Sequence, residues 1–245
     1  MEATDLQDHI SNQYNQELEE IRTRVLKMGG LVEELLDTAI TGLLKSDSAL
    51  CVQAIEDDTK VNDAELEIDE ECTRILALRH PTASDLRLIL SVIKTITDLE
   101  RIGDESEKIG FLGKRLISEG EFPKRIKRNV KHLSRLVKNN LRDVLNAFAR
   151  SDGEAALDVI KNDAEIDEYY ESMLREQLTY MMEDPRMIRS SMEVMWVARA
   201  LERIGDHAKN IAEHVIYMLL GHDIRHLEIS KHKDFSTLAD KLQSP

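Results

Sequence analysis

The chain has 245 residues, of which 42% are hydrophobic and only 4% aromatic, and its formal net charge is −14. The hydrophobic content is enough for a packed core, which argues against global disorder, and the length fits one large domain or two small ones. The acidity argues against a nucleic-acid partner, because duplex-binding proteins normally carry a basic footprint. It is compatible both with cation binding and with an ordinary solvated acidic surface.

The first residues are acidic and lack an apolar run, so the sequence predicts no signal peptide. The longest late apolar stretch, 215–220, is far shorter than the about 20 residues that a membrane-spanning helix needs. We therefore expect a cytoplasmic protein without membrane insertion. Cys51 and Cys72 fall on one predicted helix, too far apart to bond with each other, and Cys72 lies on an apolar stripe expected in the core.

Helical periodicity runs through almost the whole chain, and no convincing strand pattern interrupts it. Capping residues and breakers end each helix: Ser-Asp pairs, the residues before two prolines, and finally Gly221. The widest break, at 119–123, is the best candidate for a domain boundary. The predicted helices span about 5–45, 48–79, 83–118, 124–150, 153–183 and 186–220, and a polar tail follows.

The two halves of the chain repeat each other. Ser46-Asp47 matches Ser151-Asp152, and the sequence Leu-Glu-Arg-Ile-Gly-Asp at 99–104 returns unchanged at 201–206. Helices joined by short connections favour antiparallel neighbours, so each half is expected to form an up-down-up bundle. We predict an all-α fold of two tandem, pseudo-symmetric three-helix bundles, with domains at 1–120 and 121–221 and a polar C-terminal tail at 222–245.

The repeated motif places two carboxylates four residues apart in each half, Glu100 with Asp104 and Glu202 with Asp206. At that spacing both side chains point to one side of a helix, and like charges there cost a few tenths of a kcal/mol. The glycine inside each motif costs about 1 kcal/mol relative to alanine, which is tolerable where a neighbouring helix comes close. Two interpretations remain: a carboxylate metal site in each half, or an exposed charged face.

A second polar pair in each half is positioned to face the motif. These pairs are Asp58 with Asn62 and Asp163 with Asp167, on or beside the apolar stripes of their helices. A carboxylate on an apolar stripe needs a partner, and a cation shared with the motif helix would supply one. Alternatively, acidic residues in the early turns of a helix compensate the helix dipole. The sequence leaves both explanations open.

The paired positions offer oxygen ligands only, which suits Mg²⁺, Mn²⁺, Ca²⁺ or iron and disfavours structural zinc. A ferritin-like di-iron enzyme would need Glu-x-x-His, but glycine follows three residues after Glu100 and Glu202. The sequence also lacks a phosphate-cradling glycine loop, a nucleophile elbow and a Ser/His/Asp arrangement. We therefore predict a protein that is not an enzyme.

Three further features are explained most simply as parts of the protein surface. Glu33 and Asp37 form an acidic pair that we expect mainly on the surface. The basic segment 124–142 either balances the acidic first half or contacts an acidic partner. The late histidines do not follow one consistent helical spacing, so we expect them to be solvated or to face a partner; they are His207, His214, His222, His226 and His232.

Several motifs together closely resemble the PhoU family of bacterial phosphate-transport regulators. They are the duplicated Leu-Glu-Arg-Ile-Gly-Asp, Met-Gly-Gly at 28–30, Pro-Thr-Ala-Ser-Asp-Leu-Arg at 81–87, Asp-Val-Leu-Asn-Ala-Phe-Ala-Arg at 143–150 and Tyr-Met-Met-Glu-Asp at 180–184. The resemblance covers almost the whole chain except the final residues. It implies two three-helix bundles, a cytoplasmic location and oligomerisation, commonly as a homodimer.

The resemblance also implies multinuclear metal clusters held by Glu(Asp)-x-x-x-Asp motifs, with iron, zinc, manganese and magnesium associated with relatives. In this sequence the motifs fall on Glu100/Asp104 and Glu202/Asp206, faced by Asp58/Asn62 and Asp163/Asp167. Asn62 departs from the strict Asp pattern, and this departure lowers the negative charge of the first site.

The function implied by the resemblance is negative regulation of the phosphate regulon. A member would act as an adaptor between the ATPase subunit of the high-affinity phosphate ABC transporter and the phosphate-sensing histidine kinase. When phosphate is plentiful, it would restrain both uptake and signalling, and it would reach the membrane only through these partners. The alternative is a carboxylate-bridged metalloenzyme, such as a phosphohydrolase or an oxidase.

Overall fold

The computed structural model describes residues 3–118, 120, 124–225, 227 and 234–243. Within these ranges it contains helices and no strand. Six long helices account for most of the chain: α1 (Ala3–Lys45), α2 (Ser48–Arg79), α3 (Ala83–Ser118), α4 (Lys124–Arg150), α5 (Gly153–Glu183) and α6 (Ile188–Leu220). A 3₁₀ turn, η1 (Pro185–Met187), precedes α6, and a short helix, α7 (Phe235–Gln243), follows the bundles.

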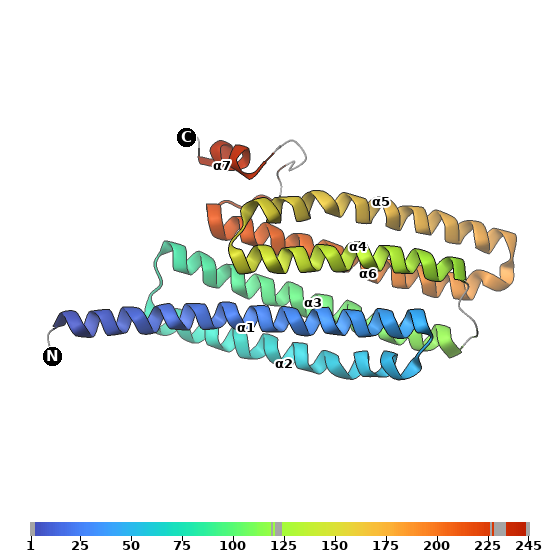
Figure 1. Ribbon diagram of the computed structural model, residues 1–245, viewed down its shortest axis with the longest axis horizontal. Helices are drawn as coiled ribbons and strands as arrows, with labels where there is room; N and C mark the ends of the chain where they lie inside the picture. The colour runs from blue at the N-terminus through green and yellow to red at the C-terminus, as the bar shows by residue number, and fades with distance from the viewer. Residues whose placement is uncertain (1–2, 119, 121–123, 226, 228–233, 244–245) are drawn as a thin grey trace.

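The six long helices form two three-helix bundles that lie side by side (Figure 1). Helices α1, α2 and α3 pack on one another, as do α4, α5 and α6. The bundles meet where α3 packs on α6 and α1 packs on α4, and each of these pairs runs antiparallel. The predicted all-α fold of two tandem bundles is confirmed.

The helix ends follow the local chemistry that the sequence indicates. Ser46 and Ser151 both adopt a left-handed backbone, with φ of 56° and 52°, and so end α1 and α4. The aspartate after each serine caps the next helix: Asp47 accepts the amide of Ala49 at 3.0 Å, and Asp152 accepts that of Ala155 at 3.0 Å. The boundary expected at 119–123 lies outside the described residues except for position 120.

A buried polar cluster joins the two bundles at the α3–α6 interface. Asp98 of α3 accepts hydrogen bonds from three side chains of α6: His207 Nδ1 at 2.8 Å, His214 Nε2 at 2.9 Å and Asn210 Nδ2 at 3.1 Å. Burial opposes ionisation of Asp98, but these hydrogen bonds lower the pKa of its carboxyl to about 2. The expectation that the histidines are solvated is therefore wrong for His207 and His214. They lie seven residues apart, two helical turns, and so share one face.

Two ion pairs extend this interface along the antiparallel helices. Arg203 contacts Glu105 at 2.7 Å, and Arg115 contacts Glu193 at 2.5 Å. Both carboxylates are almost fully buried. The contacts between α3 and α6 therefore fix the relative position of the bundles through charge as well as through apolar packing.

The acidic pair on α1 also contributes to the contact between bundles. Asp37 pairs with Lys138 of α4, and Glu33 lies 3.6 Å from Arg142 of the same helix. Both carboxylates are solvent-accessible, as expected for a surface pair. By the repeat, Lys138 corresponds to Glu33 and Arg142 corresponds to Asp37. The ion pairs cross this correspondence, because each basic residue contacts the counterpart of the other. This crossing indicates that a pseudo-two-fold axis relates the halves.

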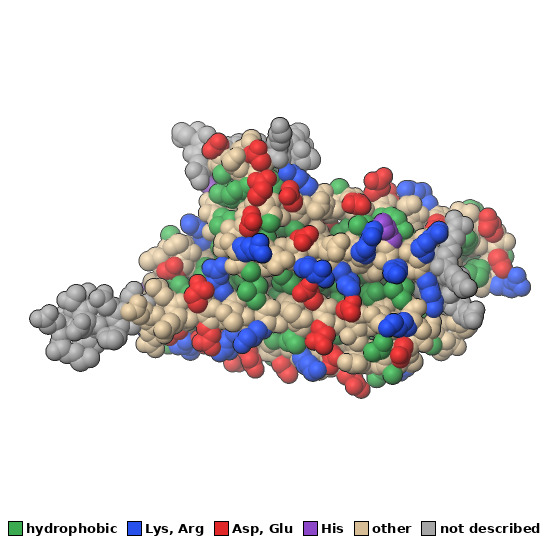
Figure 2. All heavy atoms as spheres, viewed as in Figure 1, with side chains coloured by type: hydrophobic (Ala, Val, Ile, Leu, Met, Phe, Trp, Pro, Cys, Tyr) green, Lys and Arg blue, Asp and Glu red, His purple; other side chains and the backbone are tan. Residues whose placement is uncertain are grey.

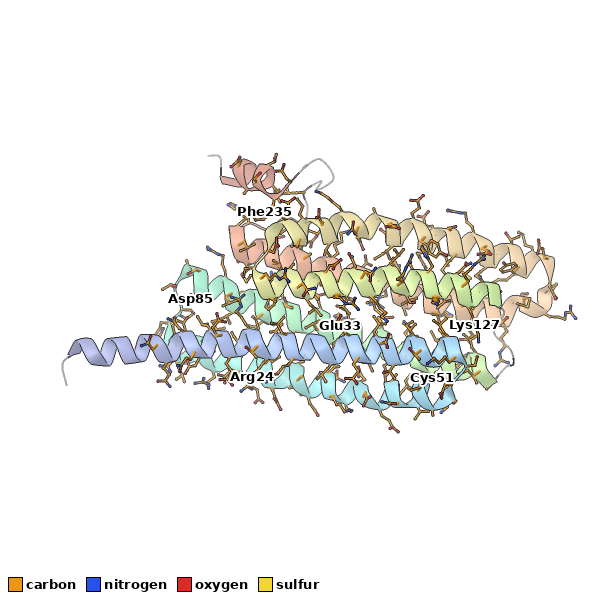
Figure 3. All side chains as sticks on the ribbon, in the orientation of Figure 1. Arg24, Glu33, Cys51, Asp85, Lys127 and Phe235 are labelled. Atoms are coloured by element: carbon orange, nitrogen blue, oxygen red, sulfur yellow. The ribbon has the colours of Figure 1, made fainter. Side chains whose placement is uncertain are left out.

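The C-terminal tail is not entirely polar, contrary to the prediction from the sequence. Helix α7 packs beside the start of α5, where the Phe235 ring contacts Gly153 and Leu238 is fully buried (Figure 3). Any Cβ at position 153 would clash with the ring, so the glycine allows this contact. His226 and His232 lie outside the described residues. Among the described helices, none has a stretch apolar and long enough to cross a bilayer.

Candidate metal centres

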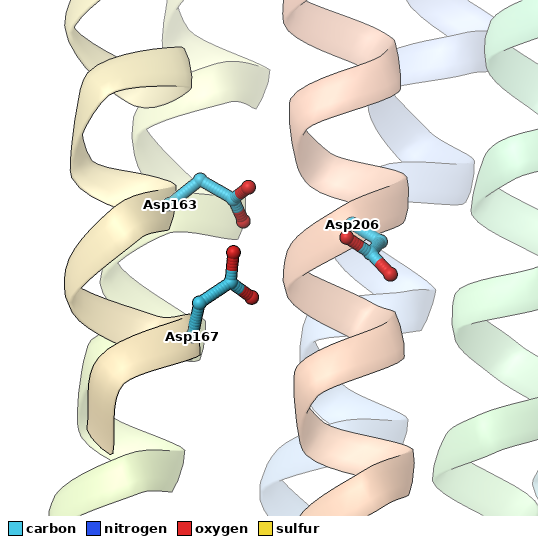
Figure 4. Close-up of side chains that lie close together, drawn as sticks. All are labelled: Asp163, Asp167 and Asp206. Carbon is cyan, nitrogen blue, oxygen red and sulfur yellow. The ribbon is translucent and has the colours of Figure 1, made fainter. Parts of the chain in front are cut away.

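Three carboxylates converge in the second bundle (Figure 4). Asp163 and Asp167 come from α5 and Asp206 from α6, and one oxygen of each lies within 4.8 Å of the others. Asp163 is almost fully buried, Asp206 is half-buried and Asp167 is exposed. The cluster thus opens to solvent on one side and ends in the packed interior on the other.

The glycine of the motif allows α5 and α6 to approach each other beside this cluster. A Cβ placed on Gly205 would lie 3.2 Å from Ile166 and 3.5 Å from Asp163 Oδ1. In the first bundle, a Cβ on Gly103 would lie 2.9 Å from Asp58 Oδ1. Each motif glycine therefore faces the first residue of the polar pair on the opposing helix, which agrees with the predicted close approach.

Two basic side chains enter the second cluster, and the sequence analysis missed both. Lys209 Nζ donates to Asp163 Oδ2 at 2.8 Å, and Arg199 pairs with Glu202. By the repeat of 102 residues, Lys209 corresponds to Glu107. Aligning the two halves therefore shows a basic residue in the second bundle where the first has an acidic one. Lys209 acts as a built-in cation that compensates part of the buried negative charge.

Burial and mutual repulsion disfavour the charged form of the second cluster. Burial, together with the neighbouring Asp206, raises the pKa of Glu202 to about 7. Burial and Asp163 raise the pKa values of Asp206 and Asp167 in the same way. In Lys209 burial acts to lower the pKa, but the hydrogen bond to Asp163 and the negative charges of Asp163, Asp167 and Asp206 together outweigh it, so the net pKa is raised. When no metal ion is bound, the two basic side chains, Lys209 and Arg199, therefore do not neutralise all the negative charge of the carboxylates.

Two oxygens of the second cluster have no hydrogen-bond partner among the described residues. They are Asp163 Oδ1 and Glu202 Oε2, both buried. A buried acceptor left unpaired costs about 1–3 kcal/mol. A cation shared by these carboxylates would satisfy them, and an all-oxygen donor set suits a hard ion such as Mg²⁺, Mn²⁺, Ca²⁺ or iron. The residues present fit such an ion.

The corresponding cluster in the first bundle is looser. Asp58 is buried and accepts a hydrogen bond from Asn62 at 2.9 Å, while Asp104 is exposed and Glu100 half-buried. Across the described part of this bundle, no three carboxylates converge as Asp163, Asp167 and Asp206 do. Asn62 supplies a hydrogen-bond donor where Asp167 supplies a charge, so Asp58 is partly satisfied without a cation.

The first cluster is nevertheless strongly acidic. Glu65 and Glu107, which the sequence analysis did not single out, lie close enough to Asp104 to feel its charge. Burial raises the pKa values of Glu65, Glu100 and Glu107, and Asp104 contributes in each case. The structure therefore brings all eight predicted positions into two acidic clusters, one per bundle, and among the residues that it describes only the second cluster contains a converging triad.

Comparison with known proteins agrees with this architecture. The PhoU domain model matches residues 25–111 and 130–215, one match in each bundle. The chain belongs to the PhoU family. It is 51% identical to the phosphate-specific transport system accessory protein PhoU homolog of Pseudomonas putida, over 92% of this chain and 88% of that protein. It is 45% identical to the phosphate-specific transport system accessory protein PhoU of Escherichia coli K12, over 93% of each chain.

Two crystal structures of PhoU family members share the fold. PhoU from Pseudomonas aeruginosa is 48% identical and superimposes with a TM-score of 0.83, covering 85% of this chain and 100% of that one. The phosphate transport system regulatory protein PhoU from Streptococcus pneumoniae is 28% identical, with a TM-score of 0.80, covering 86% and 98%. The two-bundle architecture is therefore shared with the PhoU family across a wide range of sequence identity.

Proposed function

We propose that this chain is an accessory protein of a phosphate-specific transport system that restrains phosphate uptake and phosphate-starvation signalling. One observation supports this most strongly: 45% identity over 93% of the chain to an Escherichia coli protein named for that accessory role. The similarity covers most of the chain and includes both bundles. The proposed role is regulatory, and no reaction step is assigned to the protein.

More specifically, we propose that the protein acts as a cytoplasmic adaptor. It would connect the ATPase subunit of the phosphate ABC transporter to the phosphate-sensing histidine kinase, as a homodimer that reaches the membrane only through these partners. The buried Asp98 cluster and the ion pairs of Arg203 and Arg115 join the two bundles firmly. Two joined bundles offer separate surfaces to two partners, which supports an adaptor.

The acidic clusters would hold metal ions through the Glu-x-x-x-Asp motifs. Mg²⁺, Mn²⁺ and iron are favoured by the oxygen donors, and zinc is an additional possibility from the family resemblance. In the second bundle, Asp163 and Asp167 would bind from α5, and Asp206 with Glu202 from α6. A bound ion would supply positive charge that neutralises these carboxylates and ties the two helices together.

A deletion strain tests the regulatory role. Removing the gene should raise expression from phosphate-starvation promoters in phosphate-rich medium and increase phosphate uptake. A plasmid copy of the wild-type gene should reverse both changes. Unchanged expression and uptake in the deletion strain would refute the proposal.

The alternative function is a carboxylate-bridged metalloenzyme. It has some support from Glu202, because a carboxyl whose pKa is about 7 is typical of a general acid or base. Purified protein loaded with Mn²⁺ or Fe²⁺ should turn over neither a phosphate ester nor O₂. Turnover that disappears in Glu202→Gln would favour the enzyme and contradict the adaptor role.

A further inference from the structure

A basic groove lies where α1 ends and α4 begins, at the junction of the two bundles. It measures about 450 Å³ and is lined by Thr41, Leu44 and Lys45 of α1 and by Lys127, Arg128 and Lys131 of α4. Figure 2 shows Lys and Arg side chains gathered over this end of the molecule, and Figure 3 labels Lys127 within it. Four cations thus surround one groove in a protein whose net charge is −14.

Two cations further along α4 pair with carboxylates of α1, whereas three exposed cations of the groove form no ion pair with a carboxylate of the described residues. Further along α4, Lys138 pairs with Asp37 and Arg142 with Glu33. In contrast, no carboxylate of the described residues forms an ion pair with the exposed side chains of Lys45, Arg128 or Lys131. The two parts of the basic segment therefore differ: one joins the bundles, and the other presents its positive charge to solvent.

The pseudo-symmetric end of the molecule shows which of these charges the fold needs. Lys127 Nζ donates to Ser46 Oγ at 2.9 Å where α1 ends. At the opposite end, Arg22 takes the corresponding place and donates to Ser151 Oγ at 3.1 Å, where α4 ends. One cation at each end thus contacts the serine that terminates a helix.

Lys45 corresponds to Arg150 by the repeat, but the other two cations of the groove, Arg128 and Lys131, have no basic counterpart. At the positions that correspond to Arg128 and Lys131, the first bundle has Thr23 and Leu26. The same helix–helix junction therefore forms without these two charges. Since packing of the junction does not require them, they are available to a ligand.

We infer that this groove binds an acidic segment of a partner protein. This inference deepens the adaptor role proposed above and rests on it. The exposed cations Lys45, Arg128 and Lys131 attract a short acidic segment, while the Leu44 side chain and the lysine methylenes offer apolar contact. Duplex DNA or an anionic membrane would extend beyond the groove and meet the acidic remainder of the surface, which repels it.

The test compares two double variants of the full chain with equal charge change. Lys45→Glu/Lys131→Glu reverses the groove and leaves the Lys127–Ser46 hydrogen bond in place. Lys27→Glu/Lys114→Glu is the matched control, because both lysines are exposed and lie outside the groove. Binding of a labelled hexaglutamate peptide, of the purified ATPase subunit and of the full-length kinase in nanodiscs is measured at low and high salt, after thermal melting has shown that each variant folds.

We expect the groove variant to bind hexaglutamate and one of the two partners at least about tenfold more weakly than wild type, with the control unchanged. Equal weakening in both variants, or unaltered binding in the groove variant, would overturn the inference. Preferential binding of anionic vesicles, duplex DNA or inorganic phosphate to the wild-type groove would also overturn it. If wild type binds hexaglutamate through the groove but neither partner, the adaptor role fails instead.

Discussion

The two acidic clusters have the same motif, the same internal glycine and the same placement between two helices, yet they differ in organisation. In the second bundle, Asp163, Asp167 and Asp206 converge and Lys209 supplies a cation. In the first bundle, Asn62 bonds Asp58, and no three carboxylates converge among the described residues. The repeated motif therefore places a cluster, while the residues opposite it decide how tightly that cluster can hold an ion.

The largest expected difference between the bundles is in metal affinity. Asp163→Asn/Asp206→Asn should weaken the tighter Mn²⁺ site by more than about 100-fold, since loss of even an outer partner of a metal site costs roughly 10–100-fold. Asp58→Asn/Asp104→Asn, the matched change in the first bundle, should leave this site within a few-fold of wild type. Titration calorimetry measures both, and loss of the tighter site in the first-bundle variant alone would reverse the assignment.

The next difference is the dependence of stability on pH. Because the folded state raises the pKa of Glu202 from 4.5 to about 7, folded protein binds this proton more tightly, and stability is lost as pH rises through that interval. Glu202→Gln should therefore stabilise metal-free protein by about 2 kcal/mol at pH 8 and have little effect at pH 4. Glu100→Gln should stabilise metal-free protein at pH 8 by a smaller amount. Urea unfolding at both pH values checks this, and a loss of stability at pH 8 would contradict it.

Helix spacing also differs between the bundles. Gly110 corresponds to Ala212, and a Cβ on Gly110 would lie 2.9 Å from the Cys51 carbonyl oxygen. Gly110→Ala should destabilise the protein by about 1–2 kcal/mol, because the steric cost exceeds the gain in helix propensity. The reverse change, Ala212→Gly, should cost about 1 kcal/mol through propensity and lost packing. The midpoints of urea unfolding measure the stability of both variants. A Gly110→Ala variant that is more stable than wild type would show that a methyl group fits between α2 and α3.

The smallest expected effect concerns the built-in cation. Lys209→Met leaves Asp163 without its ion pair and should cost about 1 kcal/mol in metal-free protein, a modest value because the lysine is partly exposed to solvent. Added Mn²⁺ should then raise the melting temperature more than it does in wild type. Glu107→Gln, at the corresponding position, should instead stabilise the first bundle by relieving repulsion. A smaller Mn²⁺ effect in Lys209→Met than in wild type would indicate that the lysine assists metal binding.

The fold was predictable because its signals are local. Apolar periodicity gives the six helices, and residues such as Asp47, Asp152 and Gly221 end or begin them within a few positions. Helix α7 was missed because its stability depends on contacts far away in the sequence, including the burial of Leu238. A helix of nine residues is too short to give a pattern that predicts it.

The candidate sites were predictable only in part. Spacing of four residues places Glu202 with Asp206 and Asp163 with Asp167 on single helix faces. Which carboxylates converge depends on side chains from neighbouring helices, such as Lys209 of α6, which donates to Asp163 of α5. The burial of His207 and His214 likewise depends on Asp98, which lies more than 100 residues away in sequence. No local pattern specifies such a partner.

The most direct test of the unequal clusters is a crystal structure grown with Mn²⁺ and recorded at a wavelength where manganese scatters anomalously. We expect the strongest anomalous peak between Asp163, Asp167 and Asp206, with a weaker peak or none beside Asp58 and Asp104. A stronger peak in the first bundle, or no peak in either, would contradict this expectation.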